Sequence, residues 1–380
     1  MSSSFSPQRP EPGRCVTRTL GHGAVEVLPY CIGYAMPLSV LLGYFWGGLW
    51  TFQTVVGVFV IVPVMDLVAS RCRSGRAGEG YVKPESAAAF RLVTWIWVPV
   101  QFALLGWSLH VASSETLSAL ERLGLTLSVG LTTGCIGITF AHELMHQRGR
   151  FERSLAEALM TSVSYPHFCV AHVSGHHVDV GTPRDPATAR PGESFYAFLP
   201  RAVGGSLRCA WGIEARRLRG FALPPYGPRN RMLRHAIVLA AIYAYAGWAF
   251  GARGVAFFLG ESAVAIGLLE VINYVEHYGL FRCELAPGRY EAVEACHSWS
   301  SDHLVSNLIL INLARHADHH ARVGRSYQTL EPLHERAPQL PWGYGTMVVL
   351  ALVPPLWRRI MDHRALKWQR GTHGDMRTGT

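Results

Sequence analysis

Charged side chains are scarce in this chain of 380 residues: Asp, Glu, Lys and Arg make up 16% of it, against about 25% in ordinary soluble domains. The eight cysteines include no Cys-x-x-Cys pair, which excludes a rubredoxin or ferredoxin centre within the chain. The net charge is +9, but there is no basic helix and no aromatic-basic platform, so we expect no nucleic-acid partner. A membrane protein is the class that fits this composition.

Long apolar runs make up much of the chain. Several have about 20 residues, the length that crosses the hydrocarbon core of a bilayer, and the mean hydropathy is positive. We therefore predict an all-α integral membrane protein with a single domain at 25–365, between a polar N-terminal tail, 1–24, and a C-terminal tail, 366–380. The six predicted transmembrane helices cover approximately residues 26–48, 50–70, 92–112, 119–141, 232–251 and 254–275.

The positions of the basic residues predict the orientation in the membrane, because Lys and Arg accumulate in short cytoplasmic loops. Basic residues precede the first predicted helix and fill the loop between the second and third, at Arg9, Arg14, Arg18, Arg71, Arg73, Arg76, Lys83 and Arg91. We expect a multi-pass protein of the cytoplasmic (inner) membrane with both termini in the cytoplasm. The fourth and sixth helices then both end on that side, where 142–231 and 276–365 form a cap of helices and loops.

Three further segments of the predicted cap have recognisable patterns. Residues 150–165 have apolar residues at helical spacing, and Pro166 ends that helix. Residues 303–316 indicate another amphipathic helix. The apolar stretch 343–357 contains two adjacent prolines and predicts an interfacial or re-entrant segment.

Nine histidines fall into four short clusters outside the apolar runs. Imidazoles three or four residues apart lie on one face of a helix, from which two can reach the same metal. Nine ligands are too many for one ion, and two irons held largely by nitrogen favour oxygen activation over hydrolysis. The nine predicted ligands are His142, His146, His172, His176, His177, His277, His316, His319 and His320.

Other interpretations of these histidines are weaker. His142-Glu-Leu-Met-His146 matches a zinc-protease motif with Glu143 as general base, but a protease leaves most of the other histidines unexplained. A metal transporter would place ionisable groups within the spans, and solvated loop histidines would not repeat this pattern. Acidic residues beside the clusters are expected either to fix imidazole tautomers from outside the metal ligands or to cap helices, namely Glu143, Glu276 and Asp318.

The clusters resemble the histidine boxes of integral-membrane di-iron desaturases and hydroxylases. Asn273-Tyr-Val-Glu-His277-Tyr-Gly279-Leu280 is similar to the signature of the alkane 1-monooxygenases. The resemblance implies that the nine histidines bind two non-haem iron ions, with O2 as co-substrate and a hydrocarbon hydroxylated at a terminal or benzylic carbon. It also implies an electron donor, either rubredoxin or a ferredoxin-type protein with its reductase. A lipid desaturase of the same superfamily is the alternative.

Two details of the resemblance bear on the substrate. Ala171 stands where alkane hydroxylases of the family commonly have Glu, and xylene-type relatives look more similar there, so an aliphatic and an aromatic substrate both stay open. The second predicted span resembles the helix that lines the substrate channel, with Val58 where a bulky residue closes the far end. A valine that packs in the core or faces lipid is the alternative.

The cap also carries a group of arginines, at Arg216, Arg217 and Arg219. We expect them either to attract an acidic electron donor or to serve only the topology.

Overall fold

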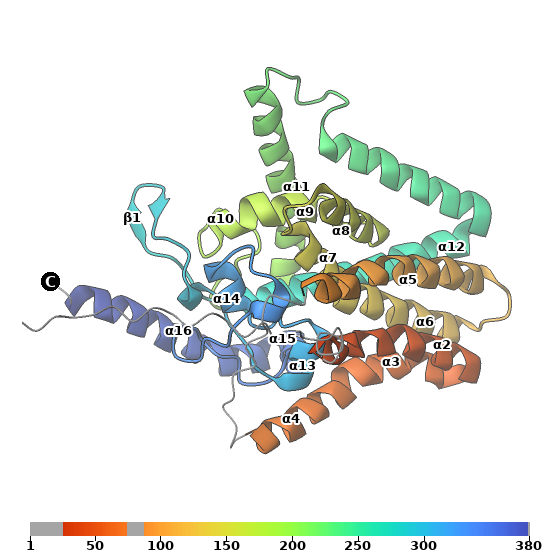
Figure 1. The fold of residues 1–380 in the computed structure, drawn as a ribbon, viewed down its shortest axis with the longest axis horizontal. Coiled ribbons are helices and arrows are strands. Elements are labelled where there is room, and N and C mark those ends of the chain that lie inside the picture. Colours follow the sequence, from red (N-terminus) through yellow and green to blue (C-terminus); the bar gives the residue numbers. More distant parts are fainter. Residues whose placement is uncertain (1–25, 74–86, 379–380) are drawn as a thin grey trace, which may run out of the picture.

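The structure is a computed structural model that describes residues 26–73 and 87–378. Nearly all of the regular structure in these ranges is helical, apart from one small hairpin, β1 (Glu284–Ala286) with β2 (Arg289–Tyr290). The N-terminal helices run side by side as a bundle, and the C-terminal helices α14, α15 and α16 pack at one end of it (Figure 1). The predictions for residues 1–25 and 74–86 lie outside the described residues, and these ranges contain most of the basic residues that predict the orientation.

Five helices in the described ranges are long and apolar enough to cross a membrane: Leu28–Trp46, Gly48–Ala69, Ala88–Ser113, Ala119–Met145 and Arg231–His277. The first four match the first four predicted spans. They contain the elements η1 (Leu28–Tyr34), α2 (Ala35–Trp46), η2 (Gly48–Phe52), α3 (Gln53–Val56), η3 (Gly57–Ile61), α4 (Val62–Arg73), α5 (Ala87–Ser113), α6 (Ala119–Thr132), η5 (Thr133–Gly137) and α7 (Ile138–Met145).

The fifth helix, α12 (Arg231–His277), has 47 residues, which at 1.5 Å per residue would extend about 70 Å. That is more than twice the thickness of the hydrocarbon core, about 30 Å. The helix is broken at Gly251, whose φ of 64° is outside the helical region, and Figure 1 shows it turning back there. The rings of Tyr243 and Phe258, one from each arm, lie 5.0 Å apart. The two arms match the predicted fifth and sixth spans.

Three π-helical turns interrupt the helices, at Gly57–Ile61, Thr133–Gly137 and His172–His176. A π turn contains an extra residue, so it moves the following side chains to a different face of the helix, and such turns are frequent at functional sites. Two of these turns line the cavities described below, and the third contains two of the predicted metal ligands.

The segment between α7 and α12 forms a helical layer against one end of the bundle (Figure 1). It contains α8 (Arg150–Ser162), α9 (Phe168–Ala171), the π turn η6 (His172–His176), α10 (His177–Asp179) and α11 (Phe195–Gly220). Helix α8 confirms the predicted helix at 150–165, although it ends a few residues earlier. Ser164, whose φ is 58°, lies in the turn that follows, and Pro166 comes directly after that turn.

The prediction of one helix over 303–316 is wrong. The chain forms α13 (Leu304–Ile309), turns, and begins α14 (His316–Ala321). Ile311 and Asn312 have positive φ values of 42° and 61°, which a helix does not allow. The Asn312 amide donates to the Tyr30 hydroxyl and to the Tyr327 carbonyl, and these contacts hold the turn that aims α14 back at the bundle.

The last part of the chain contains η7 (Ala295–His297), η8 (Tyr327–Thr329), α15 (Tyr344–Ala351) and α16 (Pro354–Thr378). The apolar stretch 343–357 forms α15 and the start of α16, and Met347 and Ala351 are fully buried in the core. Helix α16 continues into 366–378, the segment that the sequence analysis assigned to a tail.

A buried carboxylate connects the second span to the last part of the chain. Asp66 is 2% exposed and accepts hydrogen bonds from the backbone N–H groups of Val305 and Ser306 and from the Ser306 hydroxyl. It therefore caps the N-terminus of α13 from another element, as acidic side chains commonly do.

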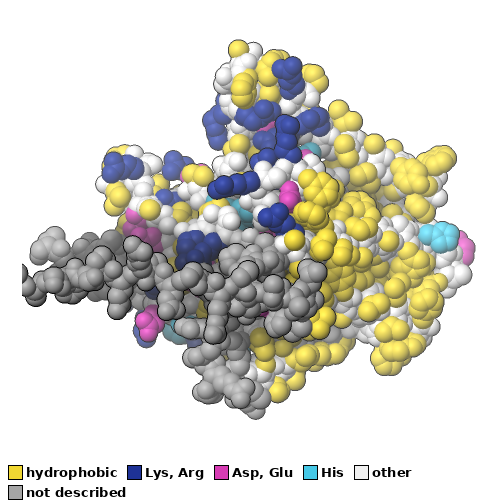
Figure 2. Space-filling view, viewed as in Figure 1, with side chains coloured by type: hydrophobic (Ala, Val, Ile, Leu, Met, Phe, Trp, Pro, Cys, Tyr) yellow, Lys and Arg dark blue, Asp and Glu magenta, His cyan; other side chains and the backbone are white. Residues whose placement is uncertain are grey.

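The surface of the bundle is apolar. Figure 2 shows hydrophobic side chains over the region of α2, α5 and α6, and Lys and Arg gathered over α11 and the neighbouring layer. Exposed side chains on the first two spans include Phe45, Leu49, Trp50 and Val60. A contiguous apolar surface of this extent is what contact with lipid requires.

Candidate metal centre

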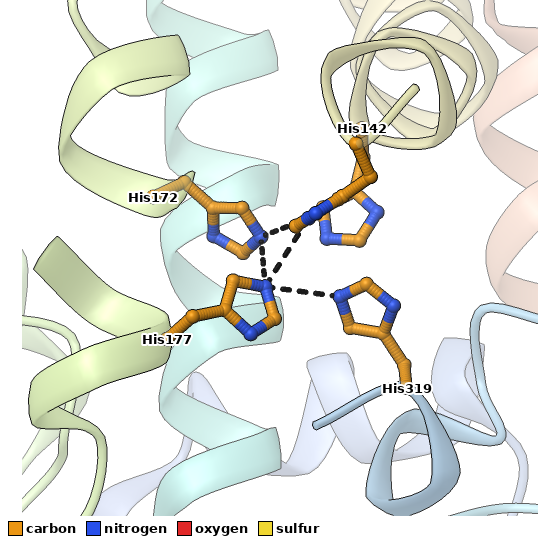
Figure 3. Close-up of side chains that lie close together, drawn as sticks. His142, His172, His177 and His319 are labelled. Carbon is orange, nitrogen blue, oxygen red and sulfur yellow. Dashed lines mark hydrogen bonds between the residues drawn. The ribbon is translucent and has the colours of Figure 1, made fainter. Parts of the chain in front are cut away.

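The nine predicted histidines come together in two groups, whose candidate ligand atoms lie within 4.8 Å of one another in each group. The sequence analysis expected the fourth and sixth helices to end on one side, beside the predicted cap, and the nine histidines do come together at one end of the bundle. Figure 3 shows four of these imidazoles pointing toward one another from three separate segments. The first group is His142, His146, His172, His177 and His319, and the second is His176, His277, His316 and His320.

Each predicted ligand comes from the end of a helix or from a short helix. His142 and His277 lie in the last turns of α7 and α12, which deliver them to the same end of the bundle. The π turn at His172–His176 changes the pairing expected from the spacing. His172 shares its group with His177, five residues on, whereas His176 lies in the other group. Five-residue pairing follows from the i to i+5 bonding of a π turn.

The distances within the first group fit a metal ion. The Nε2 atom of His177 lies 2.9 Å from that of His172, 3.2 Å from that of His146 and 3.1 Å from that of His319. One imidazole nitrogen has a single proton or a single lone pair, so it cannot satisfy three neighbours at once. Metal–nitrogen bonds of about 2.1 Å at right angles place adjacent nitrogens about 3 Å apart. A cation between the rings therefore accounts for the arrangement.

The second group fits a metal as well. The Nε2 atoms of His277 and His316 are 3.2 Å apart. His176 Nε2 and both ring nitrogens of His320 are buried without a hydrogen-bond partner among the described residues. A buried nitrogen without a partner is costly, and a metal ion held by one nitrogen of each ring would remove part of that cost.

Six of the predicted ligand rings outside the spans have pKa values shifted toward the neutral form. Burial lowers the pKa of His146 to about 4. Burial also lowers the pKa values of five more of these rings well below the usual range, and neighbouring imidazoles add to the effect. These rings are His172, His177, His316, His319 and His320. Neutral imidazoles offer a lone pair without having to lose a proton first.

Asp185 is a functional residue that the sequence analysis missed. Its Oδ2 atom lies 2.9 Å from His176 Nδ1 and accepts from the Thr188 hydroxyl at 2.7 Å, and its Oδ1 accepts from Ala187 N at 3.1 Å. Burial alone would raise the pKa of Asp185, but the neighbouring His176 imidazole and the hydrogen bonds to the carboxylate outweigh it and lower the pKa. The carboxylate holds the proton of His176 on Nδ1, which leaves Nε2 free for a metal. The Asp-Pro-Ala-Thr turn, with its Asp to i+2 contact, is the sequence signal for this arrangement.

The three acids that the sequence analysis named lie in different positions relative to the histidines. Glu143 accepts from Gln147, and Asp318 pairs with Arg322 and Arg325. Neither has a recorded hydrogen bond to one of the nine rings. Glu276 does reach the centre, but its Oε2 atom lies 3.2 Å from His316 Nε2, the nitrogen that faces His277. It therefore lies beside the ligand atoms rather than behind the ring.

Two adjoining cavities lead to the histidines. A small one of about 30 Å³ is lined by His142, His172, His316 and Glu276. A larger one of about 220 Å³ is lined by Val58 and other side chains of the first two spans. Both are lined by Ile272, Leu310 and Tyr344, which therefore stand between them.

The larger cavity faces the lipid side of the bundle. Ile32, Ile61 and Met65 line it and are 36%, 51% and 44% exposed. Its mouth is apolar, as a path for a lipid-soluble molecule requires.

Two buried polyhistidine groups that could each hold a metal ion lie at the end of an apolar helical bundle, and together they define a histidine-rich membrane protein. A family model described as fatty acid desaturase matches residues 120–351. The chain is 39% identical to alkane 1-monooxygenase 1 of Pseudomonas aeruginosa over 92% of its length and 93% of the relative. It is 36% identical to alkane 1-monooxygenase 2 of Alcanivorax borkumensis over 88% of both chains. The chain belongs to the alkane 1-monooxygenase family of oxidoreductases.

A more distant relative is the hydroxylase component of the xylene/toluene monooxygenase of Pseudomonas putida, which is 28% identical over 88% of this chain and 87% of its own length. These relatives and the apolar helices make the protein a multi-pass membrane protein.

We expect Asp185→Asn to weaken metal binding about 10- to 100-fold, the usual effect of losing a partner that orients a ligand. The amide keeps the size of the side chain, but its NH2 group opposes the Nδ1–H of His176. Metal content after dialysis against a graded series of chelator measures the effect. Asp179→Asn, in the same layer but paired with Arg184, is the control. Equal retention of metal by both variants would contradict the role of Asp185.

Proposed function

We propose that this protein hydroxylates the terminal carbon of an alkane, or the methyl group of an alkylaromatic, to a primary alcohol. The reaction takes one O2, two electrons and two protons, and it releases one water. The observation that carries this proposal is the apolar cavity that opens toward lipid and adjoins two buried histidine groups.

The cofactor we propose is a pair of non-haem irons, one in each histidine group. When bound, such a pair supplies the activation of dioxygen that attack on an unactivated C–H bond requires. The five histidines of the first group exceed the four ligands of a tetrahedral zinc site. Glu143, the general base in the protease interpretation, accepts a hydrogen bond from the Gln147 amide. Both observations disfavour a zinc protease.

The protein's own residues bind and position the hydrocarbon. A saturated chain offers no polar group to the enzyme, so its placement depends on the shape of an apolar cavity that excludes water. Ile272 and Leu310 stand where the cavity meets the histidines and would hold a methyl group there. The relatives named for alkane and xylene oxidation support this reaction over a lipid desaturase.

The decisive experiment combines metal analysis with turnover. Purified protein should contain about two irons per chain, and it should consume O2 when a redox partner and a panel of alkanes and alkylbenzenes are supplied. Identification of the products by mass spectrometry separates aliphatic from benzylic hydroxylation. Stoichiometric zinc with peptidase activity, or insertion of a double bond in place of a hydroxyl, would refute the proposal.

We further propose six membrane spans in the cytoplasmic membrane, with both termini and the histidine-bearing layer in the cytoplasm. The break of α12 at Gly251 supports six spans over five. Reporter fusions after residues 80, 220 and 375 should all report a cytoplasmic location. One periplasmic result would contradict the topology.

The electron donor, rubredoxin or a ferredoxin-type protein with its reductase, is proposed to dock by charge. Arg216 and Arg219 are exposed on α11, whereas Arg217 pairs with the buried Glu214. Figure 2 shows Lys and Arg gathered over this part of the molecule. The pairing of Arg217 indicates that it contributes to the fold, so Arg216 and Arg219 are the residues to test.

We expect Arg216→Glu with Arg219→Glu to raise the KM for an acidic donor several-fold and to flatten the fall of the rate with salt, because charge steering is lost. The KM for hydrocarbon should not change. Arg253→Glu, at the turn of α12 and paired with Glu115, is the matched control. If the KM for the donor is unchanged in the α11 variant, these arginines serve only to orient the protein in the membrane.

A further inference from the structure

The large cavity contains one pair of hydroxyl groups that the hydrocarbon reaction does not use. The Oγ atom of Ser39 lies 2.9 Å from Oγ1 of Thr54, and both residues line the cavity. The other two hydroxyls in its lining are engaged elsewhere. Ser306 donates to Asp66, and Tyr344 donates to Glu276. The remaining lining is almost entirely apolar.

The Ser39 and Thr54 hydroxyls can form a further hydrogen bond. Two hydroxyls carry two protons, and one proton is enough for the bond between them. No other acceptor for either hydroxyl is recorded among the described residues, although the Ser39 carbonyl accepts from the Gln53 amide. Gly57, one turn beyond Thr54, also lines the cavity, and a Cβ added there would meet nothing within 4 Å. The hydroxyl pair therefore adjoins open space.

The pair lies at the far end of the cavity from the histidines. The second and fourth spans run in the same direction (Figure 1), and the Ser128 hydroxyl donates to the Thr51 carbonyl. His142 is 14 residues beyond Ser128 and Thr54 is 3 beyond Thr51. At 1.5 Å per residue, the difference of 11 residues separates the two levels by roughly 16 Å. A chain that extends from the histidines through the cavity ends beside Ser39 and Thr54.

We propose that Ser39 and Thr54 bind the hydroxyl group of a long-chain primary alcohol, so that the enzyme hydroxylates the opposite, methyl end to give an α,ω-diol. This proposal rests on the proposed hydroxylase function. The reaction is HO–R–CH3 with O2, two electrons and two protons, giving HO–R–CH2OH and water, with the electrons from the same redox protein. Since the product of alkane hydroxylation is itself a primary alcohol, it can bind again in the reverse direction.

The cavity chemistry selects this class of substrate. A neutral hydroxyl can both donate to and accept from the Ser39 and Thr54 hydroxyls. A fatty-acid carboxylate would need a cation, and no Lys, Arg or His lines this cavity, so burial of the charge would be uncompensated. A plain alkane also fits, but it leaves the pair's second proton without an acceptor.

The test uses one alcohol and two products. An alkan-1-ol that binds with its hydroxyl at Ser39 and Thr54 yields the diol, and one that binds in the opposite direction is oxidised at C1 to the aldehyde. The diol-to-aldehyde ratio reports orientation independently of iron loading or donor supply. We expect the wild type to favour the diol and Ser39→Ala with Thr54→Val to lower the ratio on the order of fivefold, the factor for one neutral hydrogen bond.

Three further measurements complete the test. Thr54→Ser keeps the hydroxyl group and should keep the wild-type ratio. This variant serves as the test if the double variant folds poorly. Ser128→Ala removes the hydrogen bond from the fourth span to the Thr51 carbonyl of the second span, outside the cavity, and it should also keep the wild-type ratio. Equilibrium binding of the alkan-1-ol without an electron donor should weaken in the double variant, while alkane binding does not.

The possible failures are distinguishable. An unchanged ratio in the double variant, with alkane still hydroxylated, overturns the role of Ser39 and Thr54 but not the proposed function. An equal fall in Ser128→Ala assigns the effect to packing of the second span against the fourth and likewise overturns the role of Ser39 and Thr54. Loss of turnover with both alkane and alcohol in the wild type overturns the proposed function itself.

Discussion

His177→Ala is expected to abolish hydroxylation and to remove iron from the protein. The Nε2 atom of His177 lies within 3.2 Å of three other imidazole nitrogens, so its ring is central to the first group. Loss of a residue that only hydrogen-bonds to a metal ligand lowers the affinity for metal roughly 10- to 100-fold, and loss of a ligand itself should lower it more. We expect at least about a 100-fold fall in turnover, with the metal content measured on the same samples.

A matched variant separates loss of a ligand from loss of structure. His167 is half-buried near the same segment, and its Nε2 atom has no partner among the described residues, yet it belongs to neither group. His167→Ala should therefore keep its iron and its turnover. His277→Ala tests the second group in the same way as His177→Ala tests the first. Retained activity in either ligand variant would contradict the two-group assignment.

The sequence was sufficient to select these nine histidines as candidate ligands and to place the ends of the fourth and sixth spans on one side, because each span reverses the direction of the chain. It was not sufficient to divide the histidines between two groups. The π turn at His172–His176 places His172 in the same group as His177. The spacing of histidines in the sequence does not show where a helix contains the extra residue of a π turn. The same limit applies to Asp185, whose contact with His176 depends on how a loop folds back.

The helices were predictable to different degrees for similar reasons. Hydropathy located the first four long helices and the turn near Gly251, since a span needs a continuous apolar run. Periodicity predicted one helix over 303–316, but tertiary contacts stabilise a turn within this range. The hydrogen bonds from Asn312 to Tyr30 and to the Tyr327 carbonyl join segments distant in sequence, and they support a backbone turn that local preference alone does not predict.

Val58→Trp is expected to shift the substrate preference toward shorter hydrocarbons without changing the iron content. Val58 lines the large cavity between Thr54 at its far end and Tyr344 at its junction with the histidine cavity. One turn of helix separates Val58 from Thr54, so an indole at 58 would block the far part of the cavity while leaving the near part open. Helix α15 leaves the wall little room to yield, because a Cβ added at Gly345 would approach the Val58 carbonyl oxygen to 2.8 Å.

The size of the shift follows from the volume lost. In an apolar pocket each methylene that no longer fits changes kcat/KM by roughly 10-fold or more, so the longest alkanes should lose turnover first and the shortest should be unaffected. Val56 is 48% exposed on the same helix and does not line the cavity, so Val56→Trp adds the same indole on the lipid side. A chain-length profile that changes only in Val58→Trp assigns Val58 to the channel. If the profile is unchanged in both variants, substrate does not use the far part of the cavity. Val58 then serves only to pack the helix.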